Sequence, residues 1–186
     1  MPFPFRQHAA IVREKQAALH AAFAEVRDRY AGSPASQRWH RSVEEFYAAL
    51  KAAYPSDFEA TLNGLRRGDR EGVDVLIEFL EADPMFFRSG YTKTKVLRAL
   101  KGVPLTTSQV ARLHAVILGV VSNRWSREFG DYVRLALKLD HPNLRAGLRA
   151  LLSGHGAETR LRARRMLATL PETPGGSPRD WRRQND

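Results

Sequence analysis

The chain has 186 residues and a formal net charge of +10, with 30 Lys or Arg, 20 Asp or Glu and no Cys. This length suits one domain with a sizeable core, and the absence of Cys excludes disulfides and thiolate metal or redox sites. No signal peptide is recognisable at the N-terminus, and the longest uncharged apolar run, 113–123, is far shorter than a membrane span. We therefore expect a soluble cytoplasmic protein that has no membrane partner.

The first predicted element is a helix over residues 6–30, in which apolar residues recur at helical spacing. The sequence GSPAS at 32–36 breaks the chain after it. A second amphipathic helix follows, and Ser42 with Glu45 forms a capping box at its predicted start. We assign residues 1–36 to an N-terminal helix and linker.

Helix signals continue to residue 170, and no segment has the period-2 pattern of a strand. Ser56 with Glu59 forms another predicted capping box, and Thr106 with Gln109 predicts the start of a later helix. The helices predicted after the second one span 56–68, 70–82, 91–101, 107–122, 127–139, 142–153 and 157–170. The remaining residues, 171–186, are rich in Pro, Gly and Ser, and we expect a disordered basic tail.

A shift of the sequence by 35 residues aligns two columns of mostly leucine positions. The columns are Leu62, Leu97, Tyr132 and Leu167, and Leu65, Leu100, Leu135 and Leu170. The intervening helices repeat at the same offset in Leu113 with Leu148 and Ile117 with Leu152. Helix pairs that stack on one another produce such a period.

The period and the helix-pair pattern over roughly residues 56–170 resemble the HEAT-like family of helical repeats. The resemblance implies a short α-solenoid of stacked antiparallel helix pairs, and HEAT-like arrays generally serve as curved surfaces that bind proteins or nucleic acids. We therefore expect an all-α fold, with a helical-repeat domain at 37–170 and an additional N-terminal helix.

Known catalytic motifs are absent from the sequence, including the P-loop, G-x-G-x-x-G, G-x-S-x-G and H-E-x-x-H. No two of the six His lie within one helical turn, so no metal site is indicated. Asp69 and Glu71 could act as an acid–base pair, but their place at a helix start favours interaction with the helix dipole. We predict no catalytic residue, metal ligand or cofactor and leave enzymatic activity open.

The charge is distributed unevenly. Residues 1–83 contain 11 Lys or Arg and 13 Asp or Glu, whereas residues 84–186 contain 19 and 7, so the net charges are −2 and +12. No acidic residue occurs between Asp83 and Glu128, a stretch of 44 positions. The excess of Arg over Lys, 24 against 6, is typical of a GC-rich source, but such a bias does not remove acids from this stretch. A segment of this kind is typical of proteins that bind phosphate or carboxylate surfaces.

The start of the helix predicted at 91–101 is unusual, because it carries Lys93 and Lys95 where a helix N-terminus favours anions. Together with Ser89 and free backbone N–H groups, these lysines would suit a phosphate-sized anion. The alternative is that Ser89 caps the helix, the lysines are solvated and residues 85–87 fill a gap between helix pairs.

Further basic residues recur at helical spacing downstream, and stacked helices could align them into one ridge that follows a phosphate backbone. The alternative for each stripe is an ordinary solvated helix face. The residues that we predict to bind anions or nucleic acid are Arg88, Ser89, Lys93, Lys95, Arg98, Lys101, Arg127, Arg134, Lys138, Arg145, Arg149, Arg160 and Arg164.

The leading hypothesis is a non-enzymatic protein that binds nucleic acid through phosphate contacts. One alternative is a protein–protein adaptor or scaffold that recognises an acidic partner through the same surface. Another is a nucleic-acid-processing enzyme on a HEAT-like scaffold, with Asp131 and Asp140 as its obvious acids. The opposite net charges of the two parts also make self-association possible.

Overall fold

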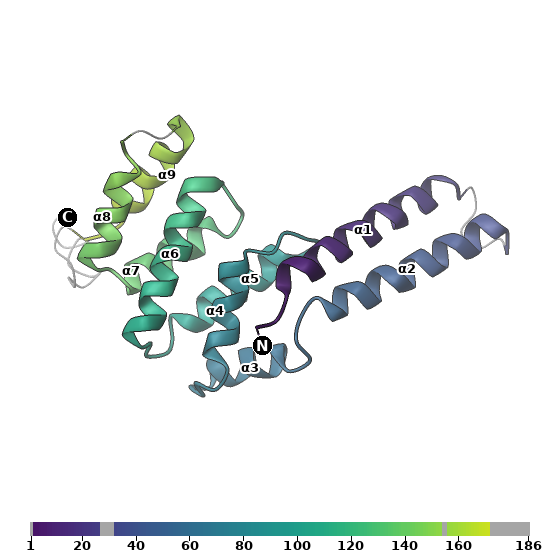
Figure 1. The fold of residues 1–186 in the computed structure, drawn as a ribbon, viewed down its shortest axis with the longest axis horizontal. Coiled ribbons are helices and arrows are strands. Elements are labelled where there is room, and N and C mark those ends of the chain that lie inside the picture. The colour runs from purple at the N-terminus through teal and green to yellow at the C-terminus, as the bar shows by residue number, and fades with distance from the viewer. Residues whose placement is uncertain (1, 27–31, 154–155, 172–186) are drawn as a thin grey trace, which may run out of the picture.

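The computed structural model describes residues 2–26, 32–153 and 156–171, and within these it contains nine helices and no strand (Figure 1). The helices are α1 (Phe5–Ala24), α2 (Pro34–Ala52), α3 (Phe58–Arg66), α4 (Val73–Ala82), α5 (Ser89–Leu100), α6 (Thr107–Asn123), α7 (Phe129–Lys138), α8 (Pro142–Ala150) and α9 (Ala157–Leu167). The all-α prediction is confirmed for this part of the chain. Residues 27–31 of the first predicted helix and 172–186 of the predicted tail lie outside it.

The first two helices, α1 and α2, pack against each other as a hairpin that projects from the rest of the molecule (Figure 1). α2 begins at Pro34, because the Ser33 side chain accepts a hydrogen bond from the backbone N–H of Ser36 and Pro is favoured at the first helical position. The start predicted at Ser42 is wrong, since its hydroxyl bonds to the Arg38 carbonyl within the helix. The predicted linker at 32–36 therefore includes the first residues of α2.

The base of the hairpin is fixed to the end of α4. Arg6 Nε donates to the carbonyl of Ala82 at 3.0 Å, and Arg13 donates to the carbonyl of Met85 at 2.8 Å. Phe5 is buried and packs edge-on against Phe79, with ring centres 5.3 Å apart. These contacts join the hairpin to the main core.

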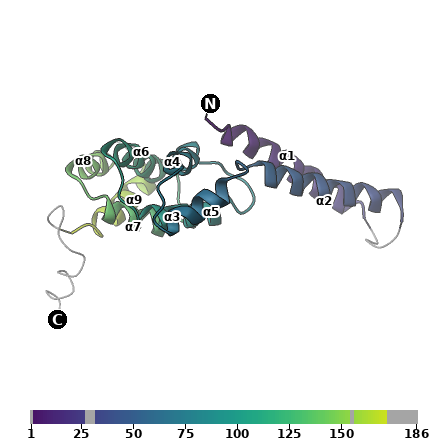
Figure 2. The same cartoon turned by 90° about the horizontal axis from the view of Figure 1, so that it is seen from below.

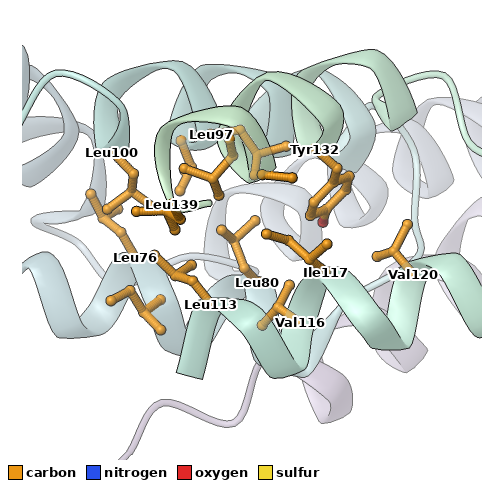
Figure 3. Close-up of a cluster of buried hydrophobic side chains, with 14 of the residues drawn as sticks. Leu76, Leu80, Leu97, Leu100, Leu113, Val116, Ile117, Val120, Tyr132 and Leu139 are labelled. Atoms are coloured by element: carbon orange, nitrogen blue, oxygen red, sulfur yellow. The ribbon is translucent and has the colours of Figure 1, made fainter. Parts of the chain in front are cut away.

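The remaining helices lie in two rows (Figure 2). α3, α5 and α7 pack in succession along one side, and α4, α6 and α8 pack in succession along the other, while α9 contacts α6 and α8. The main hydrophobic core lies between the rows, where Leu80 of α4, Leu97 of α5, Ile117 of α6 and Tyr132 of α7 gather (Figure 3). Burial of each such side chain contributes about 1.5–3 kcal/mol.

The two leucine-rich columns found at the 35-residue shift all belong to this core. Seven of their eight residues are buried, and Leu167 is partly buried against them. The repeated apolar positions of the sequence are therefore the inward positions of α3, α5 and α7. The last member of each column, Leu167 or Leu170, lies in α9 or just after it.

Neither of the two predicted capping boxes forms. Thr106 and Gln109, which correctly predicted the start of α6, do form a capping box there. The box predicted for Ser56 and Glu59 is absent, because α3 begins at Phe58 without a side-chain cap.

The start of α8 has Pro142 at its first helical position, and the side chain of His141 provides the cap. The ring Nδ1 of His141 accepts from the backbone N–H of Asn143 at 3.2 Å. Asp140 is engaged elsewhere, since both its carboxylate oxygens accept from Arg145 at 2.7 and 2.6 Å.

Among the described helices, none combines the length and the apolar composition that a bilayer crossing requires.

Candidate functional site

The N-terminus of α5 is neutralised by carboxylates from two other segments. Asp83, which follows α4, accepts a hydrogen bond of 2.6 Å from Lys93 Nζ. Glu128, which precedes α7, lies against the first turn of α5, so that a Cβ at Gly90 would be 3.1 Å from its Oε2. The anion expected at this helix end is therefore supplied by the chain itself.

These groups form a buried ionic cluster together with Arg124, which follows α6. Arg124 donates to Asp83 Oδ1 at 2.6 Å and to Glu128 Oε1 at 3.1 Å. Lys93 and Glu128 are buried, and Asp83 and Arg124 are partly buried. Two cations and two carboxylates balance inside the cluster, so it presents no net charge to a ligand.

Burial and pairing shift the pKa values of the cluster. Burial alone would raise the pKa of Asp83, but hydrogen bonds from Arg124 and Lys93 outweigh it and lower this pKa. Burial lowers the pKa of Lys93 by more than its pairing with Asp83 raises it. Burial and then the nearby Asp83 and Glu128 charges raise the pKa of Tyr132, whose buried hydroxyl has no hydrogen-bond partner among the described residues.

The connection between α4 and α5 bends sharply to place Asp83 beside Lys93. Asp83 and Arg88 both have left-handed backbone conformations, with φ of 43° and 63°. Asp adopts this conformation more readily than most residues, whereas Arg does not. Ser89 is buried just after this bend, and its hydroxyl accepts from the backbone N–H of Phe86 at 3.2 Å.

A second ionic cluster lies at the surface between α5 and α7. Asp131, in the first turn of α7, accepts from Arg98 Nε at 3.1 Å and from Arg134 Nη1 at 3.0 Å. The carboxylate is buried, but the side chains of Arg98 and Arg134 are 63% and 58% exposed. A guanidinium has five N–H donors, so one acid orients two arginines and leaves most of their donors to the solvent.

Two further cations, at the end of α3, lie next to Arg98 of this cluster. Arg66 and Arg67 at the end of α3 line a surface hollow of about 430 Å³ together with Arg98, and none of the described carboxylates lines it. Lys95 Nζ of α5 lies 3.8 Å from Glu59 Oε1 of α3, and both side chains are at least half exposed.

We name this surface the basic face. It covers the outer side of α3, α5 and α7, and its cations are Arg66, Arg67, Lys95, Arg98, Lys101, Arg127, Arg134 and Lys138. The outer side of α4 instead carries acids, and Arg112 of α6 is paired there with Asp74 at 2.6 Å and with Glu81 at 2.7 Å. The outer side of α4 and the basic face therefore carry mainly charges of opposite sign.

Six of the predicted binding residues belong to the basic face, namely Lys95, Arg98, Lys101, Arg127, Arg134 and Lys138. Lys101 is half-buried and the other five are exposed. All six lie on α5 or α7 or directly beside them, and these two helices pack against each other.

Three predicted residues cannot contact an external ligand in this structure, which corrects the prediction. Ser89 and Lys93 are buried and bonded within the chain, as described above. Arg145 is a buried residue of α8, and it donates to Asp140 and to the carbonyl of Pro171. For Lys93 and Arg145, internal carboxylates take the place that a phosphate was expected to fill.

The other four predicted residues lie apart from the basic face. Arg88 is exposed before α5, with its guanidinium 5.1 Å from the centre of the Phe87 ring. Arg149 of α8 is exposed, and on α9 Arg160 is half-buried and Arg164 exposed. Arg149 lies on α8, and Arg160 and Arg164 lie on α9, helices that pack on α6 and on each other.

The sequence interpretation missed Arg66 and Arg67, which lie in the part of the chain with net charge −2. The 35-residue period could have found Arg66, because Lys101 occupies the same position one repeat later. It also missed Tyr91, whose ring centre lies 3.9 Å from the Arg127 guanidinium.

Asp131 and Asp140, the acids of the enzyme alternative, are engaged in ion pairs, whereas Asp69 Oδ1 accepts from the backbone N–H of Glu71 at 2.9 Å. Asp131 holds two arginines and Asp140 holds Arg145. Buried His114 donates from Nε2 to the carbonyl of Leu139 at 2.8 Å. In the part of the chain that the structure describes, no three His, Asp or Glu side chains gather as metal ligands.

The fold and this site together define an all-α protein in which eight cations of the described residues lie on or beside one row of helices. Comparison of the chain with models of protein families, with curated proteins and with solved structures gave no match.

Proposed function

We propose that the protein binds nucleic acid through the phosphates that contact its basic face. We also propose that the two rows form a short α-solenoid of stacked antiparallel helix pairs, as in HEAT-like proteins. The successive packing of α3, α5 and α7 supports this arrangement, as does the burial of the columns with a 35-residue period.

The observation that carries the binding proposal is the pair of exposed arginines on Asp131. Arg98 and Arg134 come from neighbouring helices, and the shared carboxylate holds each by one nitrogen. Arginine binds phosphate through planar, often bidentate hydrogen bonds. Because the carboxylate already orients both side chains, less rotamer freedom is lost when a phosphate binds.

Phosphate contacts of this kind give affinity without base selection and make it depend steeply on salt. Each phosphate contact that is lost lowers the slope of log affinity against log salt by about 0.9 on duplex DNA and about 0.7 on a single strand. This slope provides a direct readout of how many cations of the basic face take part.

The test compares two double variants that remove equal charge. Arg66→Gln with Arg134→Gln changes α3 and α7 of the basic face, whereas Arg41→Gln with Arg149→Gln changes exposed arginines of α2 and α8. Fluorescence anisotropy with a labelled oligonucleotide is measured over a range of salt concentrations. We expect the slope to fall by about 1.8 on duplex or 1.4 on single-stranded DNA in the first variant, and by less than half as much in the second.

Two results would contradict the proposal. The first is an absence of binding to both DNA and RNA at low salt. The second is an equal loss of slope in the two double variants, which would show that only the overall charge matters.

The projecting hairpin favours a protein-binding adaptor as a second candidate. Ile11 of α1 is 37% exposed and Tyr47 of α2 is 60% exposed, and apolar side chains on a projecting element are typical of protein contacts. Capture of acidic protein partners that survive nuclease treatment would support the adaptor. Partners that nuclease removes would instead support nucleic-acid binding.

A further inference from the structure

We infer that the nucleic acid contains unpaired bases, which stack on two aromatic–arginine pairs at the edge of the basic face. The inference rests on the proposed function, and it specifies the class of nucleic acid as single-stranded.

The first pair is Tyr91 with Arg127. Tyr91 opens the exposed stripe of α5 that continues with Lys95 and Arg98, four and seven residues later. The Arg127 guanidinium carbon lies 3.9 Å from the centre of the tyrosine ring, and the tyrosine remains 51% exposed. An exposed ring thus begins the same stripe that carries the phosphate-binding cations.

The second pair is Trp125 with Arg165. Trp125 lies two residues before Arg127 in the connection between α6 and α7, and its ring packs on Phe129 with centres 4.7 Å apart. Arg165 of α9 places its guanidinium carbon 5.6 Å from the indole, which remains 39% exposed. One short connection therefore carries both an exposed indole and the arginine that covers Tyr91.

The buried ionic cluster fixes this connection at both ends. Arg124, immediately before Trp125, is bonded to Asp83, and Glu128, immediately after Arg127, is bonded to Arg124. The residues between them are thereby held in place before any ligand arrives. Such preorganisation lowers the entropy that is lost on binding.

The chemistry of this edge selects among the possible ligands. Every base has a flat π face, so bases stack on aromatic rings and guanidinium planes with little regard to sequence. In a duplex these faces are already covered by neighbouring bases. A cationic ligand is disfavoured, because arginines already lie over both rings.

The experiment uses three ligands of equal length: a single strand, an abasic strand with the same phosphates, and a duplex. The wild-type protein is expected to bind the single strand more tightly than the abasic strand at one salt concentration. Tyr91→Ala with Trp125→Ala is expected to weaken single-strand binding by roughly 5- to 150-fold for each base that loses its ring and to leave binding of the abasic strand unchanged. Tyr47→Ala, which truncates an exposed aromatic side chain of the hairpin, is the matched control.

Replacement of Tyr91 and Trp125 by Phe retains a stacking surface and is expected to preserve single-strand binding, while thermal unfolding verifies that each variant folds. Equal affinity of the wild type for base-containing and abasic strands, or a preference for duplex, would overturn the inference and leave the proposed function standing. An absence of binding to all three ligands at low salt would overturn both.

Discussion

The two ionic clusters of this protein use similar residues but have opposite relations to the solvent. In the buried cluster, Lys93 and Arg124 face Asp83 and Glu128, and the charges balance inside the fold. In the surface cluster, one carboxylate stands against two exposed arginines, so positive charge remains outside.

This difference shows that the number of cations in a segment does not determine how many of them a ligand can reach. Both clusters draw on the stretch between Asp83 and Glu128 that contains no acid. Where the fold brings Asp83 and Glu128, from the borders of that stretch, against Lys93 and Arg124, these cations are neutralised within the protein. Where it brings only Asp131 against two arginines, the arginines remain exposed to the solvent.

The largest effect is expected for Asp83→Asn, which leaves Lys93 and Arg124 without their carboxylate. We expect the free energy of unfolding to fall by about 3–5 kcal/mol, because removal of one partner exposes the cost of burying the others. Asn tolerates the left-handed backbone of this position, so backbone strain does not confuse the result. Urea unfolding of the variant and the wild type measures the loss.

The matched control is Asp74→Asn, which removes a carboxylate from an exposed pair with Arg112. Its cost should not exceed about 1 kcal/mol, as is typical of surface ion pairs. Similar losses in the two variants would mean that the buried cluster is no more important for stability than a surface pair.

Acid should reproduce part of the Asp83→Asn effect. The lowered pKa of Asp83 means that the unfolded chain binds a proton at this carboxyl at a higher pH than the folded chain does. The contribution of the Asp83 carboxylate to stability is therefore complete above its pKa in the unfolded chain, about 3.9. It is lost as the pH falls through the lower pKa of the folded state. Unfolding free energies measured from pH 6 to pH 2 should decline less steeply in Asp83→Asn than in the wild type, and parallel curves would contradict this assignment.

In the surface cluster we expect each single arginine variant to lower the free energy of unfolding only slightly, and the double variant to lower it more. Arg98→Gln and Arg134→Gln should each cost about 0–1 kcal/mol, because Asp131 keeps the other arginine. The double variant should cost about 0.5–3 kcal/mol more than the sum of the two, since the buried carboxylate is then left without a cation. The cycle is measured by urea unfolding, and repeating it in an Asp131→Asn background should abolish the coupling.

The smallest effect is expected for Tyr132→Phe. The hydroxyl lies among buried charges, yet none of the described residues bonds to it, so its removal should change stability by no more than about 0.5 kcal/mol. Tyr54→Phe is the control, because the Tyr54 hydroxyl lies 2.9 Å from Thr92 Oγ1, and it should cost about 0.5–1.5 kcal/mol. An equal cost in both variants would indicate that the Tyr132 hydroxyl has a hydrogen-bond partner after all.

Local pattern was sufficient to predict most helices, because each has a buried stripe that the 3.6-residue period of apolar side chains reveals. The 35-residue columns identified inward positions such as Leu97 and Leu135 for the same reason. The start of α2 was predicted late, since Ser33 and Pro34 looked like part of a chain break and in fact cap and open the helix.

The site was predictable only in part, because ion pairing depends on contacts between segments far apart in the chain. Arg124 meets Asp83 from 41 residues away, and Arg98 meets Asp131 from 33 residues away. The helical period separates Lys93 from Arg98, because Lys93 begins the apolar stripe that continues with Val96, Leu97 and Leu100, whereas Arg98 lies on the exposed stripe. The partners that neutralise Lys93 in the core are known only once the neighbouring helices are placed.

The complete burial of Lys93 also determines its chemical reactivity. An acylating reagent or an acetyltransferase needs an accessible, unprotonated amine, and the Lys93 amine is enclosed by protein with no exposed surface. Lys95, two residues further on, has a half-exposed side chain and can be modified in the folded state. The order in which these neighbouring amines become acylated would therefore report whether the helix pair around α5 is closed or has opened.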